Sequence, residues 1–240
     1  MTRPFIVAID GPAGAGKSTA SRLVAARLGF AMVDTGAIYR AVALAATRAG
    51  VALDDDARLA VLLPAVEIRF APSAAPGGGQ RVLLGEADVS VEIRTPAMSL
   101  GASKVSGRPV VRAGLLDLQR RLALSEGNRG AVLEGRDIGT VVFPDANAKF
   151  FLTASPEERA RRRHAELAGK GDPATFEEVL ADQLRRDRDD SERAVAPLRP
   201  AADALVIDTS GLSLPEVVER LVAEVAARRG SDPSRPGGRG

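Results

Sequence analysis

A run of residues near the N-terminus has the composition and spacing of a phosphate-binding loop. Residues 11–18, Gly-Pro-Ala-Gly-Ala-Gly-Lys-Ser, match the pattern G-x-x-x-x-G-K-[ST] at every position. The glycines let successive backbone N–H groups turn toward phosphate oxygens, and the helix that follows adds the positive end of its dipole. Lys17 is spaced to reach the β- and γ-phosphates, and the Ser18 hydroxyl can bind Mg²⁺. We therefore expect a nucleoside triphosphate to bind at Gly11, Pro12, Ala13, Gly14, Ala15, Gly16, Lys17, Ser18 and Thr19.

Two further polar segments follow apolar runs that have the pattern of strands. Residues 34–40 (DTGAIYR) come after the second such run, and residues 134–140 (EGRDIGT) after the third. Ligands gather at the carboxyl ends of the strands in an open parallel sheet. Arg40 lies one turn into a helix and is placed to hold the phosphate of an acceptor, whereas packing explains Tyr39 more simply. The adjacent Arg136 and Asp137, flanked by glycines, predict a second part of a binding site.

Two arginine-rich helices in the C-terminal half allow two interpretations. The residues that share a helix face are Arg159, Arg162 and Arg163 in the first and Arg186, Asp190 and Arg193 in the second. If these residues form surface ion pairs, each pair would contribute about a few tenths of a kcal/mol to the stability of the fold. Behind a P-loop, the helices could instead form a lid that excludes water, and their like charges would then need bound anions as partners. His164, the only histidine, is expected to be solvated.

The remaining pattern predicts the frame that positions these segments. Apolar runs at 5–9, 31–33, 131–133, 150–152 and 205–207 indicate five buried parallel strands. Helical periodicity covers 16–28, 37–49, 55–63, 96–104, 109–124, 175–194 and 214–228, and residues 155–158 (SPEE) have the pattern of a helix start. Period-two alternation in 66–70, 81–84 and 89–93, with a turn at 76–79, indicates a small antiparallel meander. The alternation of strands and helices predicts an α/β fold with helices on both faces of a parallel sheet.

Composition limits the class of protein. The 240 residues contain no cysteine, which excludes a disulfide framework and a thiolate metal site. No apolar run approaches the ~20 residues of a membrane span and no signal peptide is evident, so we expect a cytoplasmic protein without a membrane partner. The net charge is only +2, acids alternate with arginines and aromatics are 3%, which argues against a nucleic-acid partner despite a pI of about 9.4. Residues 231–240 are expected to be disordered.

Five segments make the chain resemble the cytidylate kinases, a family of P-loop nucleoside monophosphate kinases. They are IDGPAGAGK (9–17), DTGAIYR (34–40), VEIRT (91–95), EGRDIGTVVFPD (134–145) and RAVAPL (193–198). The meander looks like the enlarged monophosphate-binding insert of that family. The resemblance implies a three-layer P-loop kinase fold with a five-stranded parallel sheet, a small antiparallel β insert and an arginine-rich helical lid. We accordingly expect a core of 1–65, 96–156 and 195–230, an insert of 66–95 and a lid of 157–194.

The resemblance also implies a reaction, in which the γ-phosphoryl group of ATP passes to CMP or dCMP with Mg²⁺ as cofactor. Carried over by position, the residues expected to face the cytosine are Thr35, Ser103, Arg112 and Asp137. The other expected substrate contacts are Arg40 and Arg136 toward the monophosphate, Arg186 and Asp190 toward the ribose, and Arg193 toward the base or phosphate, and Tyr39 is a further expected substrate-binding residue. The expected catalytic residues are Lys17, Arg136, Arg159 and Arg162, with Ser18 as metal ligand.

The choice of base also has a physical reason. A carboxylate such as Asp137 can accept a hydrogen bond from the exocyclic amine of cytosine while Arg112 donates to the ring acceptors, whereas uracil would turn an oxygen toward the carboxylate. A kinase for UMP and CMP jointly is the nearest alternative. A regulatory GTPase is disfavoured because no Asn-Lys-x-Asp signature occurs, and a nucleic-acid-binding ATPase would show salt-dependent binding. We expect a monomer whose partners are its small-molecule substrates.

Overall fold

The computed structural model describes residues 3–72, 80–169 and 171–230, which form two compact units. One unit comprises the residues up to Val33 and those from Leu122 onward, and the other is Asp34–Arg121. The second unit is larger than the insert expected at 66–95. Its helix α2 (Thr35–Arg48) packs against both α4 (Pro96–Ser106) and strand β4 (Arg81–Leu84), so helices that were expected in the core belong with the small sheet.

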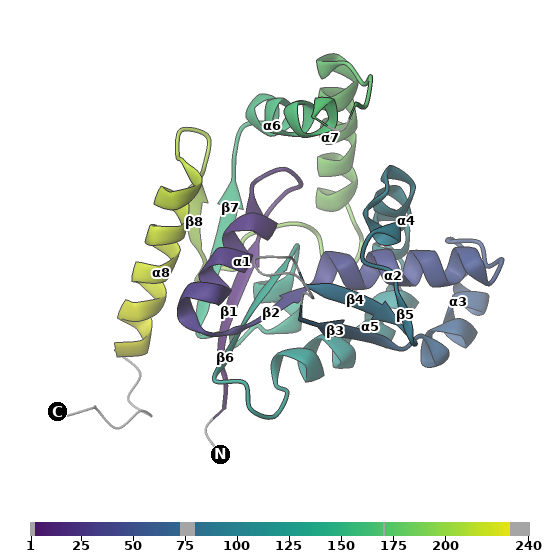
Figure 1. Ribbon diagram of the computed structural model, residues 1–240, viewed down its shortest axis with the longest axis horizontal. Coiled ribbons are helices and arrows are strands. Elements are labelled where there is room, and N and C mark those ends of the chain that lie inside the picture. Colours follow the sequence, from purple (N-terminus) through teal and green to yellow (C-terminus); the bar gives the residue numbers. More distant parts are fainter. Residues whose placement is uncertain (1–2, 73–79, 170, 231–240) are drawn as a thin grey trace. The chain divides into compact units, whose positions relative to one another are not determined.

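A five-stranded parallel sheet runs through the first unit (Figure 1). In spatial order its strands are β2 (Ala31–Asp34), β6 (Gly130–Gly135), β1 (Phe5–Asp10), β7 (Ala148–Thr153) and β8 (Leu205–Asp208). Every residue of β1 and β6 is buried, which explains their unbroken apolar runs. Asp10 lies opposite Gly135 in parallel register, so the loops after β1 and β6 leave the sheet at the same edge. The predicted α/β fold and its five strands are confirmed.

Helices α1 (Lys17–Leu28) and α8 (Leu214–Gly230) pack against each other beside this sheet. Their apolar side chains enclose the core that they share with β1 and β7. Val24, Phe150 and Leu221 are buried in its centre. This packing anchors α1, the helix that follows the predicted P-loop, by its apolar face.

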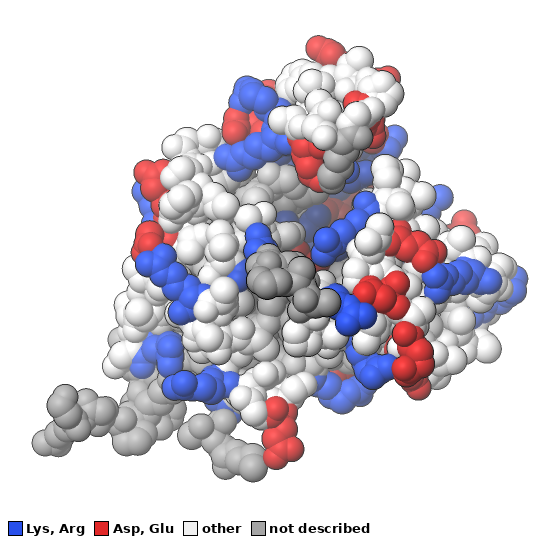
Figure 2. Space-filling model, viewed as in Figure 1, with Lys and Arg blue, Asp and Glu red and all other residues white. Residues whose placement is uncertain are grey.

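Helices α6 (Pro156–Ala168) and α7 (Phe176–Ser191) pack against each other in the same unit. Ser155 caps α6, as the sequence predicts, and Thr175 forms a capping box with Glu178 at the start of α7. Basic and acidic side chains lie side by side over both helices (Figure 2). These are the helices of the predicted lid.

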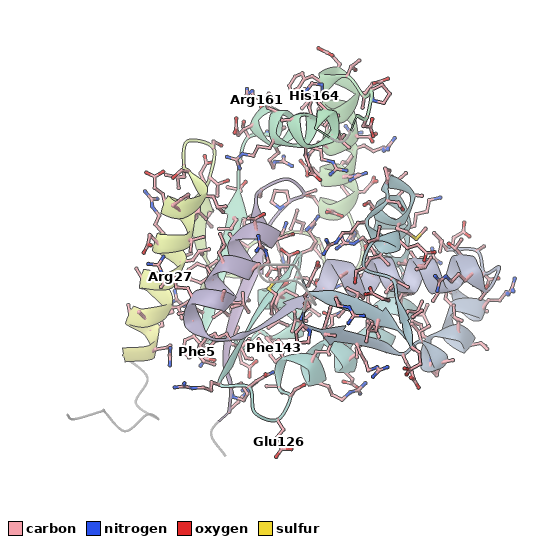
Figure 3. All side chains as sticks on the ribbon, in the orientation of Figure 1. Phe5, Arg27, Glu126, Phe143, Arg161 and His164 are labelled. Carbon is pink, nitrogen blue, oxygen red and sulfur yellow. The ribbon has the colours of Figure 1, made fainter. Side chains whose placement is uncertain are left out.

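His164 on α6 is half-buried rather than solvated (Figure 3). Its ring meets the ring of Phe176 edge to face, with the ring centroids 6.4 Å apart. The contact joins α6 to the first residue of α7, so the prediction of a simply solvated histidine is wrong. The helix periodicity could not reveal this, because the partner lies across a turn.

Helix α7 ends three residues before the predicted limit at Ala194. Pro197 cannot continue a helix and disfavours a helical conformation in the residue before it. That residue, Ala196, has a left-handed φ of 52°, and the N–H of Leu198 returns to the carbonyl of Asp190 at 2.8 Å. The chain therefore folds back onto the end of α7.

The second unit combines four helices with a small antiparallel sheet. Besides α2 and α4, the helices are α3 (Asp56–Leu62) and α5 (Pro109–Ala123), and the sheet has the order β3 (Ile68–Ala71), β4, β5 (Ala87–Asp88). Both strand pairs are antiparallel, which confirms the type of sheet that the alternating pattern predicts. The turn predicted at 76–79 lies outside the described residues.

The strand predicted at 89–93 is wrong, because these residues form a turn. The Asp88 carboxylate accepts hydrogen bonds from the N–H and the hydroxyl of Ser90, at 2.9 and 2.5 Å. Local side-chain bonds of this kind compete with strand pairing. Val89 and Ile93 are both buried one helical turn apart, with the Ile93 N–H on the Val89 carbonyl at 3.0 Å. The apolar residues therefore alternate in sequence without forming a strand.

The last strand, β8, is also less buried than predicted. It lies at the edge of the sheet, where Leu205 is 41% and Val206 53% exposed. The strand has one neighbouring strand, and one of its two faces is covered. An apolar run of this length therefore forms an edge strand here.

The tail predicted to be disordered, 231–240, lies outside the described residues. No helix within 3–72, 80–169 or 171–230 has the length and apolarity of a membrane span.

Candidate active site

The loop after β1 has a conformation that requires its glycines. Gly11, Gly14 and Gly16 have φ values of 145°, 78° and 82°, which residues with a Cβ rarely adopt. At Gly11 a Cβ atom would lie 1.9 Å from the carbonyl oxygen of Leu152, so β7 approaches too closely for any side chain. The loop leads directly into α1, whose first N–H groups face an incoming anion.

Lys17, the first residue of α1, is buried among charged groups of both signs. Its Nζ donates a hydrogen bond to the carbonyl of Pro12 at 2.7 Å. Burial, and then the positive charge of Arg136, lower the pKa of Lys17 to about 7, while the carboxylates of Glu134 and Asp10 oppose the shift. A buried ammonium beside a second cation favours an anion as partner. This point of the fold therefore suits phosphate groups.

Glu134 is a member of the site that the sequence did not single out. Its Oε1 accepts a hydrogen bond from the Ser18 hydroxyl at 2.7 Å, and the residue is 6% exposed. The two meet because β6 lies beside β1, with Glu134 opposite Ile9. A hydroxyl and a carboxylate are oxygen ligands that suit Mg²⁺, which usually takes its remaining ligands from phosphates and water. The described residues hold no group of three or more His, Cys, Asp or Glu that could bind a metal by itself, so this pair suits a metal that arrives with a nucleotide.

Asp10 is a second buried carboxylate that the sequence did not single out. It is 4% exposed, and its two oxygens accept hydrogen bonds from the backbone N–H groups of Ile138 and Gly139, each at 2.8 Å. Burial raises the pKa of Asp10 to about 6, although these two bonds lower it, and the charge of Asp137 adds to the rise. Asp10 thereby joins the strand before the P-loop to the turn after Asp137.

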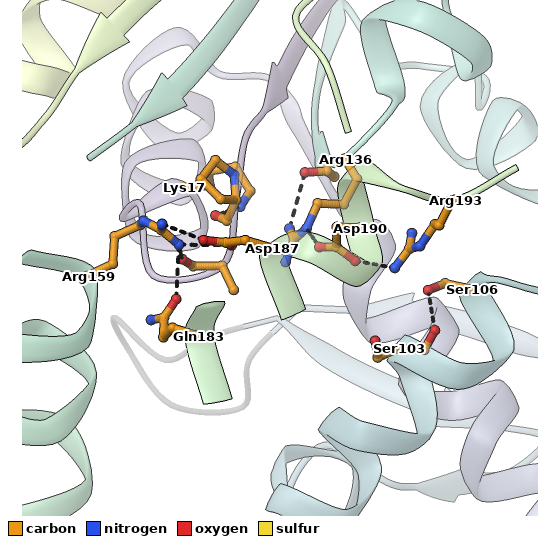
Figure 4. A network of polar contacts seen from close by, with 12 residues as sticks. Lys17, Ser103, Ser106, Arg136, Arg159, Gln183, Asp187, Asp190 and Arg193 are labelled. Atoms are coloured by element: carbon orange, nitrogen blue, oxygen red, sulfur yellow. Dashed lines mark hydrogen bonds and ion pairs between the residues drawn. The ribbon is translucent and has the colours of Figure 1, made fainter. Parts of the chain in front are cut away.

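Asp190 in α7 links two of the predicted arginines (Figure 4). Its Oδ2 accepts a hydrogen bond from Arg136 Nε at 2.8 Å, and its Oδ1 pairs with Arg193. Asp190 is 5% exposed, and its two cationic partners compensate for the burial of its charge. Asp137, next to Arg136, is also buried. The structure thus brings together residues that the sequence placed in separate segments.

Arg159 in α6 is surrounded by protein acceptors (Figure 4). It forms a bidentate ion pair with Asp187 of α7, with N–O distances of 3.0 and 2.5 Å, and it donates to Gln183 Oε1 at 3.0 Å. It also donates to the carbonyl oxygens of Ala154 at 2.9 Å and Ala13 at 3.1 Å. Because Ala13 belongs to the P-loop, Arg159 ties both lid helices to that loop.

Other lid arginines also have acidic partners, so the expectation that they need bound anions is wrong for them. The ion pairs are Arg161 and Arg162 with Glu158, Arg163 with Glu166, and Arg185 with Asp182. Arg162 also donates to the carbonyl oxygen and the hydroxyl of Thr209, at 2.6 and 3.1 Å. The acids that alternate with the arginines in the sequence supply these partners at helical spacing.

Arg186 differs from its neighbours on α7. Its Nε is buried and has no acceptor among the residues that the structure describes. Burial lowers the pKa of Arg186, and the like charges of Arg163 and Arg185 add to the shift while Asp182 opposes it. Buried donors in folded proteins nearly always have an acceptor. A bound anionic or hydroxyl-bearing ligand would supply one here.

Replacing Asp187 with asparagine is expected to lower the free energy of unfolding by about 3 kcal/mol, because it leaves a buried guanidinium without its counter-charge. The Arg159 side chain is 4% exposed and that of Asp187 23%. Asp182 on the same helix provides a matched control, since its pair with Arg185 is more than half exposed on both sides. Asp182→Asn is expected to change stability by less than about 0.5 kcal/mol. Urea denaturation measures both, and equal losses would contradict a tie through Arg159.

In the second unit, the structure brings Tyr39 and Arg112 together. The Arg112 guanidinium lies 6.0 Å from the centre of the Tyr39 ring and donates to the Ser106 carbonyl at 3.1 Å. Both residues are buried, as a packing role for Tyr39 would require. The Ser103 carbonyl accepts a hydrogen bond from the Ser106 hydroxyl at 3.0 Å, so the end of α4 carries Ser103 near the acceptor of Arg112.

Thr35 and Arg40 both lie on α2 behind its N-cap residue, Asp34. The Asp34 carboxylate accepts the N–H of Ala37 at 2.8 Å and pairs with Arg40 at 3.1 Å. Thr35 is buried, and Arg40 is partly exposed. Arg40 Nε is buried without an acceptor among the described residues, so Arg40 retains a donor for a ligand.

These features define a P-loop phosphotransferase. A glycine loop follows a central parallel strand, a buried lysine begins the next helix, and a hydroxyl–carboxylate pair suits Mg²⁺. Within the first unit, Arg136 lies close to Lys17 and Arg159 binds the P-loop. The chain belongs to the cytidylate kinase family, whose sequence profile matches residues 7–227.

Three similar proteins illustrate how far the family likeness extends. The chain is 54% identical over 231 residues to a cytidylate kinase of Geobacter sulfurreducens, which covers 96% of this chain and 97% of that protein. It is 53% identical over 223 residues to one from Geobacter sp. (strain M21), covering 93% of each. A cytidylate kinase of Syntrophotalea carbinolica is 50% identical over 238 residues, 99% of each chain. The likeness therefore includes both units.

Proposed function

We propose that the protein transfers the γ-phosphoryl group of ATP to CMP or dCMP, giving ADP and CDP or dCDP. The observation that carries this proposal is the buried Lys17 beside the partly exposed Arg136, at the shared edge of β1 and β6. Lys17 ends the donor loop, whereas Arg136 precedes Asp137, the residue expected to contact the acceptor's base. Donor and acceptor phosphates that meet between these cations would neutralise both. The full-length likeness to cytidylate kinases supports the choice of acceptor.

The reaction needs no nucleophile from the protein, because the acceptor oxygen belongs to an anionic phosphate. That oxygen forms a bond to the γ-phosphorus while the bond to the β–γ bridging oxygen breaks and ADP leaves. Lys17 and Arg136 offset the charge that spreads over the transferred group. Ser18 and Glu134 would hold Mg²⁺, which supplies further positive charge at the phosphates.

Recognition of the base is assigned to a buried carboxylate and a buried guanidinium. Asp137 would accept a hydrogen bond from the exocyclic amine of cytosine, and Arg112 would donate hydrogen bonds to the acceptors of the ring. Thr35 and Ser103 would be further polar contacts. Asp137 is 4% and Arg112 9% exposed. Polar groups this well buried discriminate strongly, because the wrong base leaves them unpaired.

Residues 157–194 are proposed to act as a lid over the phosphates. Arg159 and Arg162 would approach the triphosphate by exchanging their present partners, Asp187 and Thr209, for phosphate oxygens. Arg186 and Arg40 each have a buried Nε donor without an acceptor in the part of the chain that the structure describes, and each could donate to the acceptor nucleotide. Substrates that bind the closed arrangement better would shift the equilibrium toward it. The expected monomeric state and cytoplasmic location stay predictions.

The proposal is tested by release of ADP from ATP in the presence of Mg²⁺, with and without CMP. CMP is expected to start ADP release and to yield one CDP for each ADP, and EDTA to stop both. ADP release that is independent of CMP would contradict the proposal. Release stimulated by single-stranded nucleic acid instead would favour the alternative of a nucleic-acid-binding ATPase.

A further inference from the structure

The turn that follows β6 depends on a side chain from a different strand. It is a single π-helical turn, Ile138–Val142, which begins directly after Asp137. The first N–H groups of a helical turn have no acceptor within it. Those of Ile138 and Gly139 both donate to Asp10, one to each carboxylate oxygen, at 2.8 Å. Asp10 therefore caps this turn, although it lies 128 positions before Ile138 in the sequence.

We propose that Asp10 is a positioning residue for the acceptor nucleotide: its carboxylate fixes the turn that carries Arg136 and Asp137. The inference rests on the proposed function, which assigns these two residues to the acceptor. They immediately precede the two N–H groups that Asp10 binds, so the backbone on their C-terminal side is held by Asp10. On their N-terminal side it is held by β6, where Gly135 lies opposite Asp10 in register.

An ionised carboxylate is an unfavourable choice here if stability is its only role. Burial and the nearby charge of Asp137 raise the pKa of Asp10 to about 6, even though the two N–H bonds lower it. A neutral asparagine would avoid the cost of burying the charge. However, its amide group turns a donor toward one of the two N–H groups, whereas a carboxylate accepts from both. The charge is therefore explained by the need to hold two adjacent backbone donors.

Close packing on the other side of the contact provides an independent means of disturbing it. A Cβ atom on Gly139 would lie 3.4 Å from Asp10 Oδ2 and 3.2 Å from the Lys149 side chain. Gly139→Ala therefore crowds the turn beside this contact, most closely against the Lys149 side chain. Asp145 provides the matched control, because it is an exposed acid of the same segment that pairs with Arg3.

The test compares KM for CMP, KM for ATP and the ratio of kcat/KM for CMP over UMP in the full-length enzyme. Asp10→Asn is expected to raise KM for CMP by about tenfold or more, because a charge-assisted hydrogen bond to the turn is lost. KM for ATP is expected to rise by a smaller factor, because the Asp10 charge also favours the ammonium form of Lys17. The preference for CMP over UMP is expected to fall with it. Gly139→Ala should change the same quantities in the same direction by a smaller factor, and Asp145→Asn none of them. Circular dichroism verifies that each variant is folded.

Two outcomes would overturn the inference. If Asp10→Asn raises KM for ATP as much as KM for CMP, Asp10 supports the P-loop and not the acceptor. If the variants are folded and neither KM moves, the contact is structural only. A wild-type enzyme that does not use CMP counts against the proposed function instead, and the same comparison of KM values is then made with the monophosphate that it does use.

Discussion

Replacing Lys17 with alanine is expected to lower kcat for phosphoryl transfer by about 10³-fold while the protein stays folded. The ammonium lies at the start of α1, 2.7 Å from the Pro12 carbonyl, where it can follow the charge that moves onto the leaving phosphates. No other lysine lies in the P-loop. The guanidinium of Arg136 already donates a hydrogen bond to Asp190. The lost charge therefore has no substitute within the loop.

Stability should change little, because burial disfavours the charged form of Lys17. Its pKa is lowered to about 7, so removing the ammonium relieves a cost as well as losing a hydrogen bond. Single-turnover assays measure the chemical step, and thermal denaturation verifies the fold. Lys104→Ala, at an exposed lysine of α4, is the control and should keep wild-type kcat. Turnover near the wild-type value in Lys17→Ala would contradict the assignment of the P-loop.

Replacing Asp137 with alanine is expected to remove most of the preference for CMP over UMP. The ratio of their kcat/KM values should fall by about 10²-fold or more, because the carboxylate is proposed to accept a hydrogen bond from the amine of cytosine and would repel the oxygen of uracil. Burial of Asp137 to 4% exposure makes water a poor replacement for either contact. KM for ATP should move far less than KM for CMP.

Asp145→Ala, in the same segment but with an exposed side chain, is the control for the Asp137 variant. Steady-state kinetics with CMP and UMP at saturating ATP measure the ratio in all three proteins. An Asp137→Ala enzyme that keeps both its KM for CMP and its preference over UMP would show that another residue reads the base. Arg112, which donates to the carbonyl of Ser106 beside Tyr39, would be the next candidate.

Features that depend on neighbouring residues in the chain could be predicted from the sequence. The P-loop at 11–18 joins a fully buried, largely apolar strand to a helix, and both the strand and the glycine conformations follow from local composition. The start of α6 at Ser155 likewise needs only the cap, the proline and the first acids of the helix. For the same reason, the order of strands and helices was predictable.

Features that depend on partners far away in the sequence could not be predicted. Glu134 meets Ser18, and Asp10 meets Gly139, only because β6 and β1 are neighbours in the sheet. No spacing in the sequence encodes that adjacency. Within the lid, the sequence shows the like charges on each helix. It does not show that an acid of α7, Asp187, pairs with Arg159 of α6.

Exposure and local capping explain the other differences. Leu205 and Val206 are as apolar as a buried strand, yet they lie in an edge strand that, among the described residues, pairs with β7 alone. Around Ser90, a side-chain cap outweighs the alternating pattern. The boundary at Asp34, where α2 joins the small sheet rather than the P-loop unit, depends on tertiary packing that helix periodicity does not report.

The most direct measurement is the kcat/KM of the full-length protein for CMP, dCMP, UMP, AMP and GMP, with ATP and Mg²⁺ held constant. Asp137 and Arg112 as readers of cytosine predict that CMP and dCMP are used about 10²-fold or more better than UMP. They also predict that AMP and GMP stay near the rate without an acceptor. A purine monophosphate as best substrate, or UMP within a few-fold of CMP, would contradict this account.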